Sequence, residues 1–395
     1  MMAASRVSPP ELAAHEALPR VLVACLPISG TENPYQSLMM DGLRENGTLR
    51  VEHGAAGRVL AALRTCIRQR PDFLHYDWNY SYFVTRSTVI TALLGMMLLA
   101  ELWIVRRLFN CRIVWTFHNI ESHEKPHPRL ERWVQQQFAR QCAWIRIMYR
   151  SSLDRTMQYL GVAAEMIRVV PMGPYFDCYP NDVSMSDARR ALGFDPEHRV
   201  LLNIGAMRRY KGILKLLSAL HEIEDPRLRL IIAGPCNVAC LAEEVRRAAE
   251  LDRRVLLMME FVPNDRLQLV LNAANAVILP FQRVENSSSV LLAMSFAKPV
   301  IAPAQGVLPE QLVQQRDLLY EEGGLHRAVV GFLSADTKEL ENAGRRNQAA
   351  VRECRWSDFA KVFCDPLEVC AARQPDAPVR HFPSGHIPRT TGQRG

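Results

Sequence analysis

The chain lacks the features that mark several large classes of protein. None of its ten cysteines belongs to a C-x-x-C pair, so neither paired zinc ligands nor a thioredoxin-like redox motif is indicated. Unpaired thiols in this number are typical of a reducing compartment. The first twenty residues contain no apolar core and no small-residue cleavage site of the kind that a secretory signal requires. These features predict a cytoplasmic protein.

Charge of one sign is present in only modest excess. The 48 Lys and Arg residues outnumber 41 Asp and Glu residues, which gives a net charge of +7 at pH 7. This excess is too weak to indicate nucleic-acid binding, but it fits an anionic partner such as a nucleotide, a phospholipid surface or an acidic sugar.

Long hydrophobic runs are also scarce, and only Ser87 to Leu108 needs a membrane check. Glu101 interrupts this run, and the apolar part before it is short for a membrane span. We therefore expect a buried helix on a parallel sheet. Its basic end, Arg106 and Arg107, could still lie near a membrane.

The 395 residues are too many for one ordinary domain. Buried-type strands alternate with helices in both halves, which predicts two α/β domains with parallel sheets. The predicted strands are Arg20–Pro27, Asp72–Tyr76, Arg112–Phe117, Ala143–Met148 and Ile167–Val170, then Arg199–Ile204, Arg227–Ala233, Val255–Phe261, Ala276–Pro280 and Lys298–Ala302. The expected organisation is a disordered tail (1–19), an N-terminal domain (20–175), a linker (176–198), a C-terminal domain (199–355), a helix (356–373) and a second disordered tail (374–395).

The stretch from Arg199 to Leu220 combines a strand, a basic turn and a helix. Its first residues are mostly apolar, and apolar residues recur at helical spacing after Gly212. The turn carries the basic residues Arg208, Arg209 and Lys211. A helix N-terminus offers free N–H groups and a partial positive charge, so this turn would attract phosphate. An ordinary strand–helix connection with solvated arginines has the same pattern, and this stretch alone does not separate the two.

A second loop of the same half, residues 280–289, also leads into a predicted helix. It ends in three consecutive serines, Ser287, Ser288 and Ser289, whose hydroxyls and neighbouring N–H groups would bind an anion. A simple N-cap with spare serines is the alternative. Because both loops follow strands of one parallel sheet, they emerge on the same side. Two such helix starts predict one ligand with two phosphates.

Three segments taken together resemble the donor half of GT-B glycosyltransferases. They are G-x-x-R-x-Y-K-G at Gly205–Gly212, A-G-P at Ala233–Pro235, and the run Ala276–Pro303. The likeness is to the large retaining family 4 and, more closely, to the β-mannosyltransferases of the xanthan pathway, which invert configuration. The N-terminal half shares it in Asn33-Pro34-Tyr35 and in W-T-F-H-N at Trp115–Asn119, followed by His123-Glu124.

The resemblance covers nearly the whole chain apart from its tails. It implies the α/β GT-B architecture, in which two Rossmann-like parallel-sheet domains face each other across a cleft. Family 4 has a glutamate pair around the second loop, and the first would be Glu285, but Ala293 occupies the second position. Family 4 also has an arginine directly after the turn glycine, where this chain has Ala206, so Arg208 would stand in for it. Both departures fit the mannosyltransferase relatives better.

The resemblance implies transfer of a sugar, mannose by analogy, from a nucleotide-diphosphate sugar such as GDP-mannose, with no further cofactor. We expect Arg208, Lys211 and the helix start at Ser287–Ser289 to stabilise charge on the leaving diphosphate. No Asp-x-Asp suited to a metal lies near either loop, so a metal-free site is the hypothesis. Glu285 and Asn286 could bind hydroxyls of the donor sugar, and Gly30 belongs to the acceptor-side loop.

An inverting transfer needs a general base that removes a proton from the acceptor hydroxyl. It must come from the N-terminal half, across the cleft. The candidates follow two predicted neighbouring strands: His118, His123 and Glu124 after one, and Asp77 after the other. Each of these, taken singly, also fits a loop residue in a local hydrogen bond.

The acceptor is expected to be a lipid-linked glycan, as in bacterial exopolysaccharide or glycoconjugate synthesis. Six arginines against two acids between Arg129 and Arg155 predict a basic face that would sit on anionic lipid, at the inner side of the plasma membrane. A solvated helix face is the alternative interpretation.

The two alternative functions are a dinucleotide oxidoreductase and a non-catalytic binding protein. A dinucleotide oxidoreductase would need G-x-G-x-x-G after a first strand, and neither half has it. A non-catalytic nucleotide-sugar or glycan binding protein of the same fold stays open, because Ala293 replaces an expected carboxylate.

Overall fold

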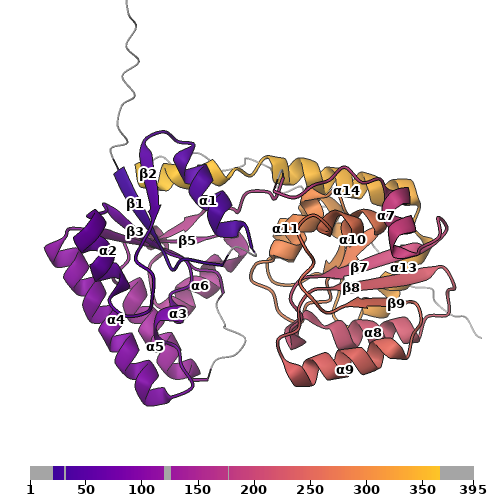
Figure 1. The fold of residues 1–395 in the computed structure, drawn as a ribbon, viewed down its shortest axis with the longest axis horizontal. Coiled ribbons are helices and arrows are strands. Elements are labelled where there is room, and N and C mark those ends of the chain that lie inside the picture. The colour runs from indigo at the N-terminus through magenta and orange to yellow at the C-terminus, as the bar shows by residue number, and fades with distance from the viewer. Residues whose placement is uncertain (1–20, 31–32, 120–125, 177, 365–395) are drawn as a thin grey trace, which may run out of the picture.

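The computed structural model of the protein describes residues 21–30, 33–119, 126–176 and 178–364. Within them the chain forms two α/β domains, each built on a six-stranded sheet in which every pair of neighbouring strands is parallel. Figure 1 shows the two domains side by side, with helices around each sheet. The fold class predicted from the sequence is confirmed.

The N-terminal sheet has the strand order β2-β1-β3-β4-β5-β6. Its strands are β1 (Val21–Leu26), β2 (Leu49–His53), β3 (Phe73–Tyr76), β4 (Arg112–Thr116), β5 (Trp144–Ile147) and β6 (Ile167–Val169). Its helices are α1 (Tyr35–Arg44), α2 (Ala61–Gln69), α3 (Tyr80–Phe83), α4 (Thr88–Leu108), α5 (Pro128–Ala139) and α6 (Leu153–Leu160), with short 3₁₀ turns η1 (Arg150–Ser152) and η2 (Ala164–Met166). The sequence pattern does not predict β2, because Arg50 and Glu52 break its apolar run at the edge of the sheet.

The C-terminal sheet has the order β12-β11-β10-β7-β8-β9. Its strands are β7 (Arg199–Ile204), β8 (Leu228–Ala233), β9 (Val255–Met258), β10 (Ala276–Ile278), β11 (Val300–Pro303) and β12 (Leu319–Tyr320). The helices are α7 (Met185–Leu192), α8 (Ile213–His221), α9 (Ala239–Glu250), α10 (Leu267–Ala273), α11 (Ser288–Ser295), α12 (Leu308–Gln311), α13 (Leu325–Ser334) and α14 (Thr337–Arg352), with 3₁₀ turns η3 (Arg209–Lys211) and η4 (Val313–Leu318). The predicted linker, 176–198, therefore contains α7.

The strand order of each sheet reverses at one point, and that point locates its binding crevice. In the C-terminal sheet the chain leaves β7 in one direction toward β8 and returns on the other side as β10. In the N-terminal sheet the corresponding pair is β1 and β3. Ligands of such sheets bind outside the carboxyl ends of the strands at this switch point. Gly205 follows β7 and Asp77 follows β3, so both lie where a site is expected.

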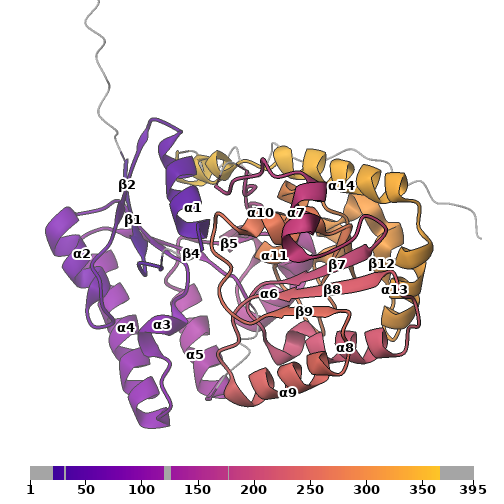
Figure 2. The ribbon, with the colours of Figure 1, turned by 45° about the vertical axis from the view of Figure 1, so that its right-hand side comes forward.

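The end of the described chain crosses back to the N-terminal domain. The segments η5 (Trp356–Ala360) and α15 (Lys361–Cys364) replace the first part of the predicted helix 356–373, whose remainder lies outside the described residues. Phe363 contacts Phe73 of β3 with ring centroids 5.1 Å apart, and Trp356 contacts Tyr35 of α1 at 5.5 Å. This crossing ties the two domains together, as Figures 1 and 2 show for the yellow segment behind α1.

Candidate active site

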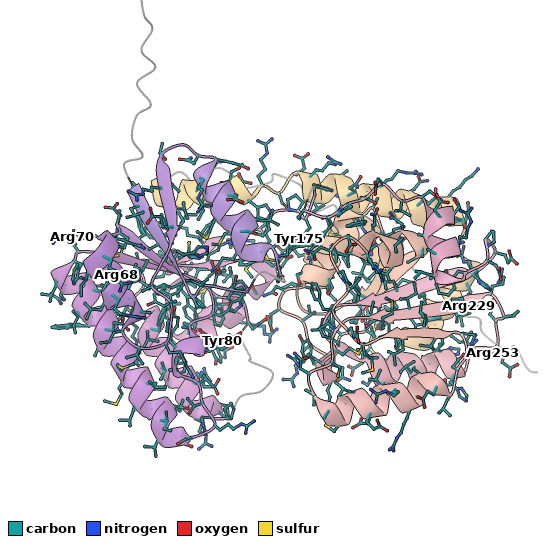
Figure 3. The ribbon with its side chains drawn as sticks, in the orientation of Figure 1. Arg68, Arg70, Tyr80, Tyr175, Arg229 and Arg253 are labelled. Carbon is teal, nitrogen blue, oxygen red and sulfur yellow. The ribbon has the colours of Figure 1, made fainter. Side chains whose placement is uncertain are left out.

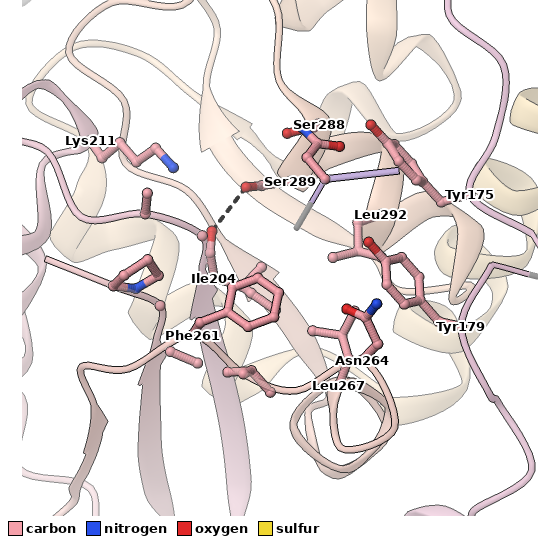
Figure 4. Close-up of a pocket in the computed structure, with 17 residues that line it drawn as sticks. Tyr175, Tyr179, Ile204, Lys211, Phe261, Asn264, Leu267, Ser288, Ser289 and Leu292 are labelled. Atoms are coloured by element: carbon pink, nitrogen blue, oxygen red, sulfur yellow. Dashed lines mark hydrogen bonds between the residues drawn. The ribbon is translucent and has the colours of Figure 1, made fainter. Parts of the chain in front are cut away.

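A cavity of about 300 Å³ opens at the carboxyl ends of β7 and β8, beside the start of α11. It is lined among others by Gly205, Lys211, Gly234, Phe261, Ser288 and Ser289. Figure 4 shows Lys211 on one side of the cavity and Tyr175 and Tyr179 on the other. We call it the donor cavity.

Gly205 lets the two predicted loops meet at the end of β7. Its φ is +108°, and an added Cβ would lie 2.6 Å from the Ser289 hydroxyl and 3.0 Å from Lys211 Nζ. A side chain would therefore collide with both groups and would be strained by the backbone conformation. Glycine at this point allows the ammonium group and the serine to approach the same strand end.

Lys211 is the cation of the donor cavity. Burial, together with the positive charge of Arg208, lowers its pKa to about 8. The depressed pKa means that the side chain sits in a poorly solvated place beside another cation. A bound diphosphate would relieve both effects, because it supplies negative charge next to the ammonium group.

Arg208 belongs to the same turn but faces a different space. It lines a second cavity of about 510 Å³ together with residues of the N-terminal domain. We call this the acceptor cavity. The turn that follows β7 therefore presents one basic side chain to each cavity, Arg208 to one and Lys211 to the other.

The three predicted serines differ in what their hydroxyls do. Ser287 is the N-cap of α11 and accepts a hydrogen bond from the Val290 amide at 3.2 Å. Ser289 donates to the Ile204 carbonyl at 3.0 Å. Ser288 is exposed and lines the donor cavity. The helix start remains available to an anion through its backbone N–H groups and the Ser288 hydroxyl, whereas Ser287 acts mainly as a cap.

The acceptor cavity contains two of the predicted catalytic candidates, Asp77 and His118. Nε2 of His118 lies 3.0 Å from Oδ1 of Asp77, and the Tyr35 hydroxyl donates to the same oxygen at 3.0 Å. Asp77 is almost completely buried. Burial opposes its charge, yet the neighbouring His75 and the hydrogen bonds from His118 and Tyr35 hold the Asp77 pKa below its usual value. Asp77 is therefore a carboxylate that accepts a hydrogen bond from the Nε2–H group of His118.

Aromatic rings hold the imidazole of His118 in place. Trp78 stacks on it with centroids 4.9 Å apart and an interplanar angle of 18°, and Tyr35 meets it edge-on at 5.2 Å. With Nε2 directed at Asp77, Nδ1 is the nitrogen left to take up a proton. A buried carboxylate that fixes the tautomer of a histidine is the arrangement used by histidine general bases.

The structure describes only some of the other predicted site residues. His123 and Glu124 fall outside the described residues. Apart from its chain neighbours, no described residue has an atom within 4 Å of the position that a Cβ on Gly30 would take. Glu285 forms an ion pair of 2.9 Å with Arg155 of α6, and Asn286 donates from its side-chain amide to the His118 carbonyl. Both thus contact the N-terminal domain, and neither lines the donor cavity.

The predicted basic face between Arg129 and Arg155 is not one surface. Arg146 is fully buried and donates to the carbonyls of Val170 and Pro171. Arg155 is engaged with Glu285. The arginines are close in sequence, but Arg146 belongs to β5, whose four residues are all buried.

Ser152 is the N-cap residue of α6 but makes no side-chain capping hydrogen bond. Ser152 donates its hydroxyl to the Tyr149 carbonyl. Instead, Glu310 of α12 accepts hydrogen bonds from the backbone amides of Arg150 and Ser151, at 2.9 and 2.8 Å. The cap of this helical segment therefore comes from the other domain.

Sequence reasoning missed several residues that shape the site. Tyr35, Trp78 and Tyr175 come from loops or helix starts whose partners are distant in sequence. Two signals were available: Tyr35 stands in the Asn33-Pro34-Tyr35 motif, and Trp78 follows a predicted strand at its carboxyl end, where ligand-binding loops of such sheets lie. Tyr175, at the junction of the domains in Figure 3, lies at the end of the N-terminal domain yet lines the donor cavity.

The model of a known protein family matches much of the second half of the chain. A model described as "Glycosyl transferases group 1" matches residues 184–344. The chain is 28% identical over 274 residues to a GDP-mannose:glycolipid 4-beta-D-mannosyltransferase of Xanthomonas campestris pv. campestris, with 69% of this chain and 70% of the relative covered. It is 23% identical over 276 residues to a D-inositol 3-phosphate glycosyltransferase of Corynebacterium glutamicum (strain R), with 65% and 66% covered.

Solved structures share the whole architecture. A sucrose-phosphate synthase from Thermosynechococcus elongatus superposes with a TM-score of 0.67 at 16% identity and covers 89% of this chain and 100% of its own. Anabaena HepE, solved in complex with UDP-glucose, superposes with a TM-score of 0.66 at 17% identity and covers 88% and 99%. At these identities the likeness shows the fold alone, which is GT-B.

Proposed function

We propose that this chain, a glycosyltransferase of GT-B fold homologous to a GDP-mannose:glycolipid mannosyltransferase, transfers mannose from GDP-mannose to a lipid-linked glycan with inversion of configuration. One observation carries the proposal. The turn after β7 presents Lys211 to the donor cavity and Arg208 to the acceptor cavity, so a diphosphate in the first would place its sugar toward the second. The Xanthomonas relative, whose name states both substrates, supports the choice of donor and acceptor class.

The reaction exchanges one bond to the anomeric carbon for another. The acceptor oxygen forms a bond to that carbon, and the bond from the carbon to the diphosphate oxygen breaks with its electron pair leaving on the diphosphate. The acceptor hydroxyl loses its proton to the base. Lys211, Arg208 and the N–H groups at the start of α11 would stabilise the charge that grows on the leaving group, which is usually the largest contribution to such catalysis.

We assign the general base to His118 and its orientation to Asp77. His118 lines the acceptor cavity, and its Nε2 is engaged with Asp77, so Nδ1 would accept the proton of the acceptor hydroxyl. The resulting imidazolium would be stabilised by the buried carboxylate. Glu124 and His123 remain predictions of the sequence pattern, and so does the binding of donor-sugar hydroxyls by Glu285 and Asn286.

We further propose that no metal ion takes part. Lys211 already occupies the place where a cation would contact the diphosphate. Its lowered pKa fits a side chain whose charged form a bound anion would stabilise. Transfer should therefore persist after treatment with a chelator and should not rise on addition of Mg²⁺ or Mn²⁺. Loss of transfer with EDTA, restored by either ion, would overturn this part of the proposal.

The setting we propose is bacterial exopolysaccharide or glycoconjugate synthesis, at the cytoplasmic face of the membrane where a lipid-linked acceptor is found. The glycolipid acceptor of the Xanthomonas relative supports it. We assign guanosine as the base of the donor by analogy with the Xanthomonas relative.

The test is a panel of nucleotide sugars offered to the purified full chain with a membrane lipid extract. We expect mannose to move from GDP-mannose to an extractable lipid, and the new linkage to have the β configuration. The Lys211→Ala variant should lose transfer, while Lys215→Ala, on the exposed side of α8, should keep it. Turnover of a different donor, an α linkage, or full activity of Lys211→Ala would each contradict the corresponding part of the proposal.

A further inference from the structure

Helix α4, Thr88–Leu108, is buried on only one side. The expectation of a buried helix holds for Leu98, Leu102 and Val105. The opposite face carries large apolar side chains at intervals of four, three and seven residues, which is the spacing of one helix face. They are Val89, Leu93, Met96 and Trp103, which are 68, 63, 61 and 57% exposed. We call them the α4 stripe.

The α4 stripe lies on the outside of the molecule. Figures 1 and 2 show α4 at the edge of the N-terminal domain that faces away from the C-terminal domain, with α5 beside it. An added Cβ on Gly95 would lie 2.8 Å from Val134, so the two helices are in close contact. Trp133, next to Val134, is 46% exposed. Contiguous exposed apolar surface of this kind marks an interaction site.

By length and composition α4 could cross a membrane, with a mean hydropathy of 2.1, but its inner face ties it to the domain. Glu101 is buried and accepts a hydrogen bond from the Leu63 amide of α2 at 2.8 Å. Leaving the domain would expose the core beneath the helix and carry this carboxyl into lipid. The geometry instead fits a helix that lies in the plane of the interface with one face in contact with lipid.

A basic pocket adjoins the C-terminal end of the α4 stripe. It measures about 250 Å³, and three arginines line it together with Trp103, Asn110 and Cys111. The arginines are Arg106, Arg107 and Arg112. None of the described residues that line this pocket is a carboxylate. The guanidinium of Arg112 lies over the Phe73 ring at 4.0 Å, so Arg106 and Arg107 are the two arginines of the pocket left to bind a phosphate. Arginine donors match phosphate oxygens. A tryptophan at its rim suits the boundary between lipid tails and headgroups.

From this we infer that the α4 stripe docks onto an anionic phospholipid membrane and that Arg106 and Arg107 hold a lipid headgroup phosphate in the pocket beside them. The inference rests on the proposed function, because it supplies the surface on which a lipid-linked acceptor would be met. Apolar and basic groups are combined on one helix as interfacial binding requires: the stripe enters the acyl boundary while the arginines stay with the headgroups.

The position of α4 relative to the acceptor cavity supports this orientation. Tyr80, Ser81 and Val84 line that cavity, and α4 begins four residues after Val84. The α4 stripe therefore starts close to the acceptor cavity and ends at the basic pocket. A protein resting on this face would bring the acceptor cavity near the membrane surface, within reach of a glycan carried on a lipid.

Vesicle flotation of the purified full chain tests the inference without donor or acceptor, so its result does not depend on the proposed function. We expect binding to vesicles of phosphatidylcholine mixed with phosphatidylglycerol, weaker binding to phosphatidylcholine alone, and release by salt. Met96→Glu should reduce vesicle binding by about tenfold or more. The double variant Arg106→Gln/Arg107→Gln should reduce binding by a similar factor, only for vesicles that contain phosphatidylglycerol.

Matched controls separate these effects from net charge and from misfolding. Leu251→Glu changes an exposed apolar residue of the C-terminal domain, and Arg247→Gln/Arg253→Gln removes the same charge there. Figure 3 places Arg253 at the end of the molecule opposite α4. All variants should keep the circular dichroism spectrum and the urea unfolding midpoint of the parent chain, which shows that they are folded. Equal vesicle binding by Met96→Glu and Leu251→Glu would overturn the inference.

Two further outcomes would also overturn it. One is phosphatidylglycerol-dependent binding that is unchanged in Arg106→Gln/Arg107→Gln. The other is retention of the chain in membranes after alkaline carbonate washing, which would mean that α4 spans the bilayer. Inorganic phosphate should not displace the protein from vesicles at concentrations comparable to the lipid, because the apolar contacts are made only with a membrane.

Discussion

His118 and Asp77 meet through Nε2 and Oδ1 at 3.0 Å, at the carboxyl ends of two adjacent strands, β4 and β3. The carboxylate is buried and shares its Oδ1 with the Tyr35 hydroxyl. Tyr35 in turn lies 3.5 Å from the guanidinium of the buried Arg146. This chain of polar contacts holds a charged carboxylate behind an imidazole that lines the acceptor cavity.

The first prediction concerns this pair. Asp77→Asn should lower kcat for transfer by roughly 10²–10⁴-fold, because the amide no longer stabilises a protonated His118 or fixes its tautomer. Affinity for GDP-mannose should stay unchanged, since the donor cavity does not contain Asp77. Steady-state kinetics with a titration of donor binding would measure both. Tyr35→Phe keeps the carboxylate and should cost far less. An Asp77→Asn variant with normal kcat would exclude the assignment.

The second prediction concerns pH and the donor. With a pKa of about 8, Lys211 is charged below that pH and neutral above it. Affinity for GDP should therefore fall as the pH rises through about 8, where an ordinary lysine would remain charged. Lys211→Arg should bind GDP with little change over the same range, because arginine does not titrate there. Calorimetric titration of both proteins across this range would decide. A parallel decline in both would place the titrating group elsewhere.

The third prediction concerns stability in acid. Burial lowers the pKa of His75 from 6.5 to about 4. Between these values the unfolded chain takes up a proton that the folded chain cannot, so stability is lost as the pH falls from 6.5 toward 4. The full loss from this residue would be about 3 kcal/mol. His75→Gln should flatten this part of the stability curve in urea unfolding, whereas His326→Gln, which changes an exposed histidine, should not.

The fourth prediction concerns the cap that one domain supplies to the other. Glu310→Ala removes the acceptor of the Arg150 and Ser151 amides and should lower stability by about 1 kcal/mol. It should also widen the spread of domain orientations in small-angle X-ray scattering, because these contacts join the domains. Glu322→Ala, at an exposed site, serves as the control. Identical unfolding and scattering of the two variants would show that the contact has no such role.

Much of the sheet framework could be predicted from the sequence. Central strands of a parallel sheet are buried on both faces, so β7 and β8 stand out as continuous apolar runs. The basic turn after β7 and the serines before α11 could also be recognised, because each follows a strand with an apolar sequence. The edge strand β2 carries charges on its exposed face, and its pattern is too weak to identify.

The sequence could not assign the contacts across the cleft. Glu285 and Arg155 are far apart in the chain, and their ion pair depends on how the two domains pack. Likewise Arg146 is one of several nearby arginines, and it is buried because β5 is covered on both faces. There it donates to the carbonyls of Val170 and Pro171. Charge counted along a chain does not say which side chains share a surface.

By itself the sequence determined the two-domain α/β architecture, the glycosyltransferase resemblance and the turn that carries Arg208 and Lys211, because these depend on local runs of residues. Tertiary structure decided the pairing of His118 with Asp77 and the separation of Arg208 and Lys211 between two cavities. It also decided which face of α4 is buried, since that helix is apolar nearly all round. The periodicity of an almost uniformly apolar helix contains little information about its orientation. Packing, including that against α2 and α5, decides which face of α4 is buried and which is exposed.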